Sequence, residues 1–139
     1  MEPHDEGRCE VVREWLMDAE EDYRLAEHLL RTAVHFAKAI AFNSQQAAEK
    51  YLKAFLTWHQ VEFPKTHDIA ELLGLVATVD PALADGLAEA ESLTPFAVKM
   101  RYPHPAKASA LRGAGNAVRV ATRVREAVLA ALKPHLDEE

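Results

Sequence analysis

Cysteine is almost absent from the 139-residue sequence, which contains only Cys9. A single cysteine cannot form an internal disulfide, and it excludes the usual cysteine-based zinc site, so the chain is predicted to fold in a reducing compartment. No apolar run approaches the roughly 18 residues that are needed to cross a membrane. Residues 1–6 are acidic, whereas a signal peptide is basic and then apolar. We therefore expect a cytoplasmic protein with no membrane association.

Glycine and proline are also scarce, with five and seven residues, whereas Ala, Leu, Glu, Lys and Arg recur in long tracts. This balance favours helices over strands. The hydrophobic content of 49% and the charged content of 27% are ordinary for a globular domain and exclude a disordered or collagen-like chain. We predict a single domain over residues 10–134, with residues 1–9 and 135–139 as short, flexible, acidic ends.

Apolar residues recur at steps of three and four in three long segments, as they do along amphipathic helices. Asp68 and Asp80 supply capping oxygens for two shorter helices, and Pro81 suits the first helical position. Phe63-Pro64 ends the second long helix. The predicted helices cover roughly residues 10–33, 36–60, 69–78, 81–93 and 111–132. The fold class predicted from them is all-α, an antiparallel up-down bundle of four to five helices.

The formal net charge of -6 hides a strong gradient along the chain. Residues 1–34 carry ten acidic and four basic side chains, whereas residues 99–133 carry eight basic side chains and one acidic side chain. Such asymmetry indicates either a site for phosphate groups or an acidic partner. The alternative is that the basic segment packs beside the acidic first helix of the same bundle.

Three sequence motifs occur in the order in which one known family places them. They are the segment from Ala41 to Ala54 (AFNSQQAAEKYLKA), the segment Lys65-Thr66-His67-Asp68-Ile69, and Leu93-Thr94 followed by Ala97-Val98-Lys99-Met100-Arg101-Tyr102-Pro103. Together these pieces span most of residues 12–130 and resemble the HEPN domain. The resemblance implies a bundle of four or five helices, homodimerisation and pairing with a minimal nucleotidyltransferase. It also implies a link to nucleotide binding, RNA cleavage or toxin-antitoxin systems.

The ribonuclease branch of that family has an arginine followed, after four to six residues, by a histidine. Here positions 106, 107 and 108, where the histidine would follow Arg101, hold Ala, Lys and Ala, but His104 lies two residues nearer. A histidine supplies a base with a pKa near neutrality, and an arginine stabilises the charge that develops on a phosphorane. Arg101 and His104 are therefore the candidate catalytic pair, in a connector that Pro103 and Pro105 make irregular.

Basic residues in the late segment form a candidate nucleotide or RNA site. Arg112, Asn116, Arg119 and Arg123 are spaced by four, three and four residues, so they share one face of the last helix. The candidate ligand-binding residues are Lys99, Arg101, Tyr102, Lys107, Arg112, Arg119 and Arg123. The alternative is that this face is solvated or paired within the chain.

Two further polar positions have structural interpretations. Thr66-His67-Asp68 is expected to cap the third helix, and Gln45 falls on the apolar face of the second helix, where its buried amide needs hydrogen-bond partners. We expect no metal and no cofactor. The favoured function is a dimeric module that associates with a minimal nucleotidyltransferase and binds nucleotide or RNA. The alternatives are a metal-independent ribonuclease toxin that uses Arg101 and His104, and a structural dimer without a ligand.

Overall fold

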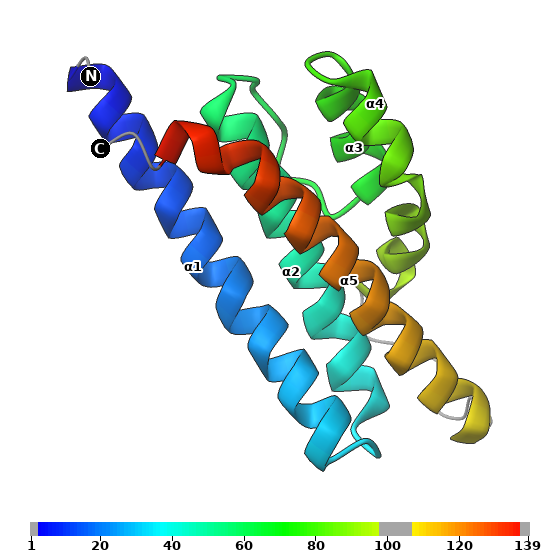
Figure 1. The fold of residues 1–139 in the computed structure, drawn as a ribbon. Helices are drawn as coiled ribbons and strands as arrows, with labels where there is room; N and C mark the ends of the chain where they lie inside the picture. The colour runs from blue at the N-terminus through cyan, green and yellow to red at the C-terminus, as the bar shows by residue number, and fades with distance from the viewer. Residues whose placement is uncertain (1–2, 98–106, 137–139) are drawn as a thin grey trace.

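A computed structural model describes residues 3–97 and 107–136, and the described chain consists of helices joined by short connections, with no strand (Figure 1). The prediction of an all-α fold is confirmed. The helices are α1 (Pro3–Thr32), α2 (Ala37–Trp58), α3 (Ile69–Ala77), α4 (Pro81–Gly86), the 3-10 helix η1 (Ala88–Ala97) and α5 (Lys107–Leu136).

The three long helices lie side by side, and the short ones cover one side of α2 (Figure 1). Helix α2 runs antiparallel to α1, because the two are joined by a short turn at residues 33–36. Helix α5 runs parallel to α2 and antiparallel to α1, so that Arg13 near the start of α1 donates a hydrogen bond to the carbonyl of Leu136 at 3.1 Å. The segment of α3, α4 and η1 leads the chain from the end of α2 back toward the start of α5. The predicted up-down order of the bundle is therefore confirmed.

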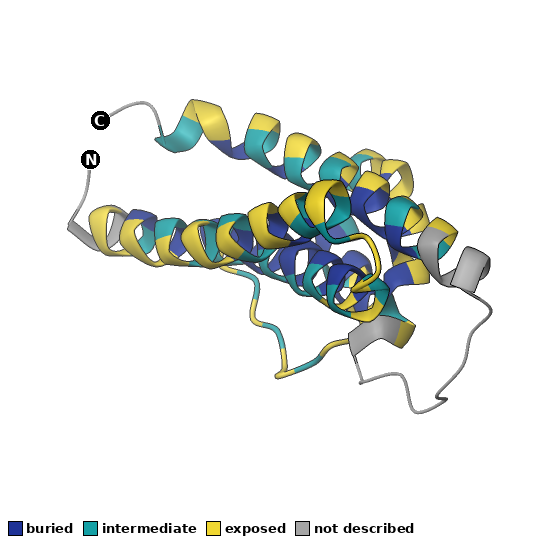
Figure 2. Cartoon of the chain, turned by 90° about the horizontal axis from the view of Figure 1, so that it is seen from below, coloured by how far each residue is buried: buried dark blue, intermediate teal, exposed yellow. Residues whose placement is uncertain are grey.

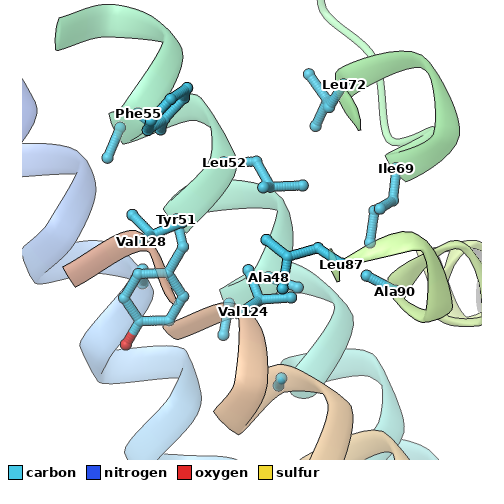
Figure 3. Close-up of a cluster of buried hydrophobic side chains, with 14 of the residues drawn as sticks. Ala48, Tyr51, Leu52, Phe55, Ile69, Leu72, Leu87, Ala90, Val124 and Val128 are labelled. Atoms are coloured by element: carbon cyan, nitrogen blue, oxygen red, sulfur yellow. The ribbon is translucent and has the colours of Figure 1, made fainter. Parts of the chain in front are cut away.

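Helix α2 is the centre of the core, since α1, α3, η1 and α5 all pack against it. From Ser44 to Trp58 every α2 residue is buried or half-buried, whereas α1 and α5 each keep an exposed face (Figure 2). In Figure 3, Leu52 extends toward Leu72 of α3, whereas the ring of Tyr51 extends toward α1. Burial of such side chains stabilises the fold by about 1.5 to 3 kcal/mol each.

Helix α1 begins earlier than its apolar pattern indicated. Residues 3–9, which we expected to belong to a flexible acidic end, are the first two turns of this helix, and Cys9 is fully buried. Residues 135 and 136 likewise belong to the last turn of α5. The apolar pattern of residues 3–9 is weak, because Cys9 is a residue that these turns bury. A buried cysteine behaves as a small apolar residue, and the sequence pattern did not mark it as part of the helix.

The predicted caps of α3 and α4 are confirmed. The Asp68 carboxylate accepts a hydrogen bond from the amide of Ala70 at 3.0 Å, and the Asp80 carboxylate accepts one from the amide of Leu83 at 3.1 Å. Each cap satisfies an amide that would otherwise lack a helical partner. Pro81 occupies the start of α4, as expected.

The segment that was predicted as one helix over residues 81–93 is divided in the structure. Helix α4 ends at Gly86, and the amide of Leu87 shares its hydrogen bond between the carbonyls of Leu83 and Ala84, both at 3.1 Å. The second of these bonds has 3-10 spacing, which η1 then continues through Pro95. Apolar periodicity alone does not distinguish the two helix types over so short a segment.

Candidate functional site

The predicted site residues divide into two groups. Lys99, Arg101, Tyr102 and His104 lie outside the described residues, so the proposed catalytic pair has no structural description. Lys107 is the first residue of α5. The remaining candidates lie along α5, and they define what we call the α5 arginine face, made of Arg112, Arg119 and Arg123.

The three side chains of the α5 arginine face are exposed, as is Asn116 between them. They recur at helical spacing along one side of α5. The whole of α5 carries six lysine or arginine residues and one acidic residue. Asn116 fixes the orientation of Arg119, because its side-chain oxygen accepts hydrogen bonds from Nε at 3.2 Å and from Nη2 at 2.8 Å. A guanidinium held in this way presents a defined fork to an anion.

Two of these arginines converge on one carboxylate of η1. Arg119 Nη2 contacts Oε1 of Glu89, and Arg123 Nη1 lies 3.7 Å from Oε2 of the same residue. Arg123 Nη2 also donates a hydrogen bond to the carbonyl of Gly86 at 3.4 Å. The α5 arginine face is therefore partly paired within the chain, and its partner is η1 rather than the acidic first helix.

Packing of a basic residue of α5 against acidic α1 does occur, at a residue that was not among the candidates. Arg125 Nε donates a hydrogen bond to Oε1 of Glu20 at 2.5 Å, and Tyr51 of α2 donates to the same oxygen. Thr122 hydrogen-bonds to Tyr23 at 2.8 Å beside this pair. These contacts connect the three long helices, so we assign them a structural role.

A shallow hollow of about 440 Å³ lies between α4 and α5, next to the α5 arginine face. Its walls are mostly apolar, with Leu83 and Leu87 on the α4 side and Ala127 on α5, and Arg123 lies at its edge. The guanidinium of Arg123 therefore borders both an apolar surface and the carboxylate of Glu89.

A second polar cluster, missed by the sequence analysis, lies between α2 and the start of α3. Oε1 of Glu49 contacts nitrogen atoms of two side chains. Nζ of Lys53 lies 3.1 Å from this oxygen, and Nδ1 of His67 lies 2.8 Å from it. The side chain of Glu49 is only 2% exposed, whereas that of His67 is 65% exposed. His67 therefore belongs to a charged cluster in addition to the capping segment.

The expectation of a buried, hydrogen-bonded Gln45 is confirmed. Gln45 is fully buried, its amide nitrogen donates to the carbonyl of His67 at 3.3 Å, and its oxygen accepts from Gln46 at 2.8 Å. The sequence contained a signal for the adjacent cluster as well, because Gln45, Glu49 and Lys53 follow one another at steps of four on one helical face.

The described residues offer neither a metal site of the usual kind nor a membrane-spanning helix. No group of three or more His, Cys, Asp or Glu side chains in this part of the chain is arranged to hold a metal ion. None of the described helices combines the length and the apolar character that a membrane span requires.

Comparison with known proteins agrees with the motifs. The HEPN domain family model matches residues 12–132. The crystal structure of an archaeal HEPN homologue superimposes with a TM-score of 0.65 at 22% sequence identity, covering 87% of this chain and 97% of that chain, which shows a shared fold. Comparison with curated proteins gave no match. Because the family model spans most of the sequence, the protein belongs to the HEPN domain family.

Proposed function

We propose that this HEPN protein is a homodimeric module that associates with a minimal nucleotidyltransferase and binds the phosphates of a nucleotide or of RNA. The α5 arginine face is the phosphate-binding surface in this proposal. The observation that carries it is the convergence of Arg119 and Arg123 on the single carboxylate of Glu89. Two guanidinium groups that hold one carboxylate in this way match the geometry that also holds a phosphate.

The pairing with Glu89 does not block such a ligand. The side chains of Arg119, Arg123 and Glu89 are between 44% and 56% exposed, and exposed ion pairs contribute at most about 1 kcal/mol. A terminal phosphate of a nucleotide carries more charge than a carboxylate, and RNA offers several singly charged phosphates that can contact the arginines together. We therefore expect phosphate groups to replace Glu89 on the two arginines, with Arg112 extending the contact by about two turns of α5.

The salt dependence of RNA binding tests this surface. The double variant Arg119→Gln/Arg123→Gln should bind single-stranded RNA more weakly and lower the slope of log K against log salt by about 1 to 1.5, because each lost phosphate contact removes roughly 0.7. Arg31→Gln is the control, since Arg31 is also an exposed, ion-paired arginine but lies at the end of α1, where it pairs with Glu27. Equal slopes for the double variant and the control would contradict the proposal.

The homodimer is supported by family membership, since HEPN domains commonly dimerise. The nucleotidyltransferase partner is proposed from the resemblance of the sequence motifs alone. Sedimentation equilibrium of the full chain tests dimerisation, and a single mass of 15.5 kDa at all concentrations would contradict it. Co-purification with a minimal nucleotidyltransferase encoded beside this chain tests the partner. Absence of any RNA or nucleotide binding at low salt would instead favour the structural dimer without a ligand.

The second candidate function is a metal-independent ribonuclease. It is supported by the two-residue separation of Arg101 and His104 in the sequence, which places a guanidinium and an imidazole in one connector. Cleavage of RNA in the presence of a chelator, lost in both Arg101→Ala and His104→Ala, would support it. Binding without cleavage by the wild-type chain would leave the module as the function.

A further inference from the structure

Glu49 has an unusual environment for a surface-seeking residue. Its side chain is 2% exposed on the central helix, and burial of a carboxylate is strongly unfavourable unless hydrogen bonds compensate. Here two donors meet at one oxygen, Nζ of Lys53 at 3.1 Å and Nδ1 of His67 at 2.8 Å. Glu49 therefore acts as a hydrogen-bond acceptor toward His67.

His67 is held at two points by buried residues of α2. Its ring is bound by Glu49, and its carbonyl accepts a hydrogen bond from the amide nitrogen of Gln45 at 3.3 Å. The ring nevertheless remains 65% exposed. His67 is therefore anchored by two buried side chains, whereas the rest of its ring is exposed to solvent and can contact a ligand.

The hydrogen bond to Glu49 also determines which ring nitrogen carries the proton. A carboxylate oxygen that already accepts from an ammonium group can only accept from the imidazole, so Nδ1 must be the protonated nitrogen. In the neutral ring Nε2 then lacks a proton and is an acceptor. Such a nitrogen binds a hydroxyl or amino group and does not bind a phosphate oxygen.

His67 lies near the last turns of η1, whereas Arg119 and Arg123 of the α5 arginine face contact Glu89 near its start. The amide of Ile69, two residues after His67, donates to Oγ1 of Thr94 at 3.1 Å, and Glu89 of the same helix contacts Arg119. A 3-10 helix rises about 2 Å per residue, so Glu89 and Thr94 are separated by about 10 Å along η1. A short single-stranded ligand is long enough to contact both ends.

We propose that His67, positioned by Glu49, accepts a hydrogen bond from a ribose 2′-hydroxyl of RNA that is bound to the α5 arginine face. The proposal rests on the proposed function for its ligand. The 2′-hydroxyl is the donor that distinguishes RNA from DNA, so this contact makes the protein selective for RNA. His67 is the group that touches the ligand, and Glu49 is a positioning residue.

The tautomer of His67 is the first test, and it requires no ligand. Nitrogen-15 shifts of the full chain, measured in alkaline buffer on the neutral ring, should show a protonated Nδ1 and an unprotonated Nε2. In Glu49→Gln the acceptor at this position is uncharged, so the preference for the Nδ1-protonated tautomer should weaken. An Nε2-protonated ring in the wild-type chain would overturn the proposal.

Selectivity between RNA and DNA is the second test. The wild-type chain should bind a single-stranded RNA about threefold to tenfold more tightly than the DNA of the same sequence, which is the effect of one hydrogen bond. His67→Asn should abolish this preference, because the asparagine amide nitrogen replaces Nδ1 at Glu49 but nothing replaces Nε2. His28→Asn, an exposed histidine on α1, is the matched control and should keep the preference.

The outcomes separate this inference from the function on which it rests. An RNA preference that is unchanged in His67→Asn overturns the role of His67, while a salt slope that still depends on Arg119 and Arg123 leaves the phosphate surface intact. If the salt slope does not depend on Arg119 and Arg123 and the wild-type chain shows no preference for RNA, both the phosphate surface and the role of His67 are overturned.

Discussion

The phenol of Tyr51 donates a hydrogen bond to Oε1 of Glu20 at 2.5 Å, which joins the central helix to α1. Arg125 of α5 donates to the same oxygen, also at 2.5 Å, so one carboxylate connects the three long helices. Burial alone would raise the pKa of Glu20, but the hydrogen bonds from Arg125 and Tyr51 prevail and lower it below 4.5. The carboxylate is thus stabilised in its charged form within the bundle.

Glu20→Gln should lower the free energy of unfolding by about 2 kcal/mol, because two hydrogen bonds to a charged acceptor are weakened. The wild-type contribution is present above pH 4.5 and is lost as the pH falls through the lowered pKa of the folded state, since the unfolded chain then binds the proton first. Urea unfolding at several pH values measures both effects. Glu14→Gln, an exposed acid on the same helix, is the control and should change stability by less than about 0.5 kcal/mol. Equal effects of the two substitutions would contradict this assignment.

Alkaline stability tests the other partner of this hydrogen bond. Burial first, and then the Glu20 carboxylate, raise the pKa of Tyr51 far above its usual value of 10.0. The unfolded chain therefore loses the phenol proton above pH 10 while the folded chain keeps it, so stability should fall as the pH rises through that range. Tyr51→Phe should remove this alkaline decrease and cost about 1 kcal/mol near neutrality. An unchanged alkaline decrease in the variant would show that another group causes it.

The sequence was sufficient to predict most of this architecture. Periodicity located α1, α2 and α5 because each buries one wide apolar face against the others, and the capping roles of Asp68 and Asp80 followed from local hydrogen bonds alone. The start of α1 and the change from α4 to η1 were missed, because short turns with few large apolar residues carry little periodic signal.

The candidate site was predictable only in part. The row of Arg112, Arg119 and Arg123 follows from spacing along one helix. The partner that Arg119 and Arg123 share, Glu89, lies about thirty residues away in the sequence, so only the packing of η1 on α5 brings it to them. The contact between Glu49 and His67 is of the same kind. Spacing in the sequence shows which residues share a face of one helix. Tertiary packing determines which residues of other helices that face contacts.

Acid stability should report on the end of the bundle where α2 and α5 terminate. Burial, followed by the charges of His135 and Arg8, lowers the pKa of His59 below 6.5, although Asp80 opposes the shift. The unfolded chain then binds a proton more readily, so stability should fall as the pH decreases below 6.5, by at most about 1.4 kcal/mol per pH unit. His59→Phe keeps an aromatic ring against Phe55 and should flatten the curve below about pH 6.5. Thermal unfolding at several pH values in this range measures the pH dependence of stability. A dependence in His59→Phe as steep as in the wild-type chain would contradict the role of His59.

The last prediction concerns Glu89, which occupies the arginines that we assign to phosphate. In Glu89→Gln a neutral amide faces Arg119 and Arg123, so a bound phosphate no longer displaces a charged competitor. RNA should bind about twofold to fivefold more tightly at constant salt, the range that corresponds to an exposed ion pair. Glu91→Gln removes the same charge from an exposed position on η1 and should tighten binding much less. Equal tightening in both variants would show that the effect comes from net charge at long range, and that Glu89 does not compete for the α5 arginine face.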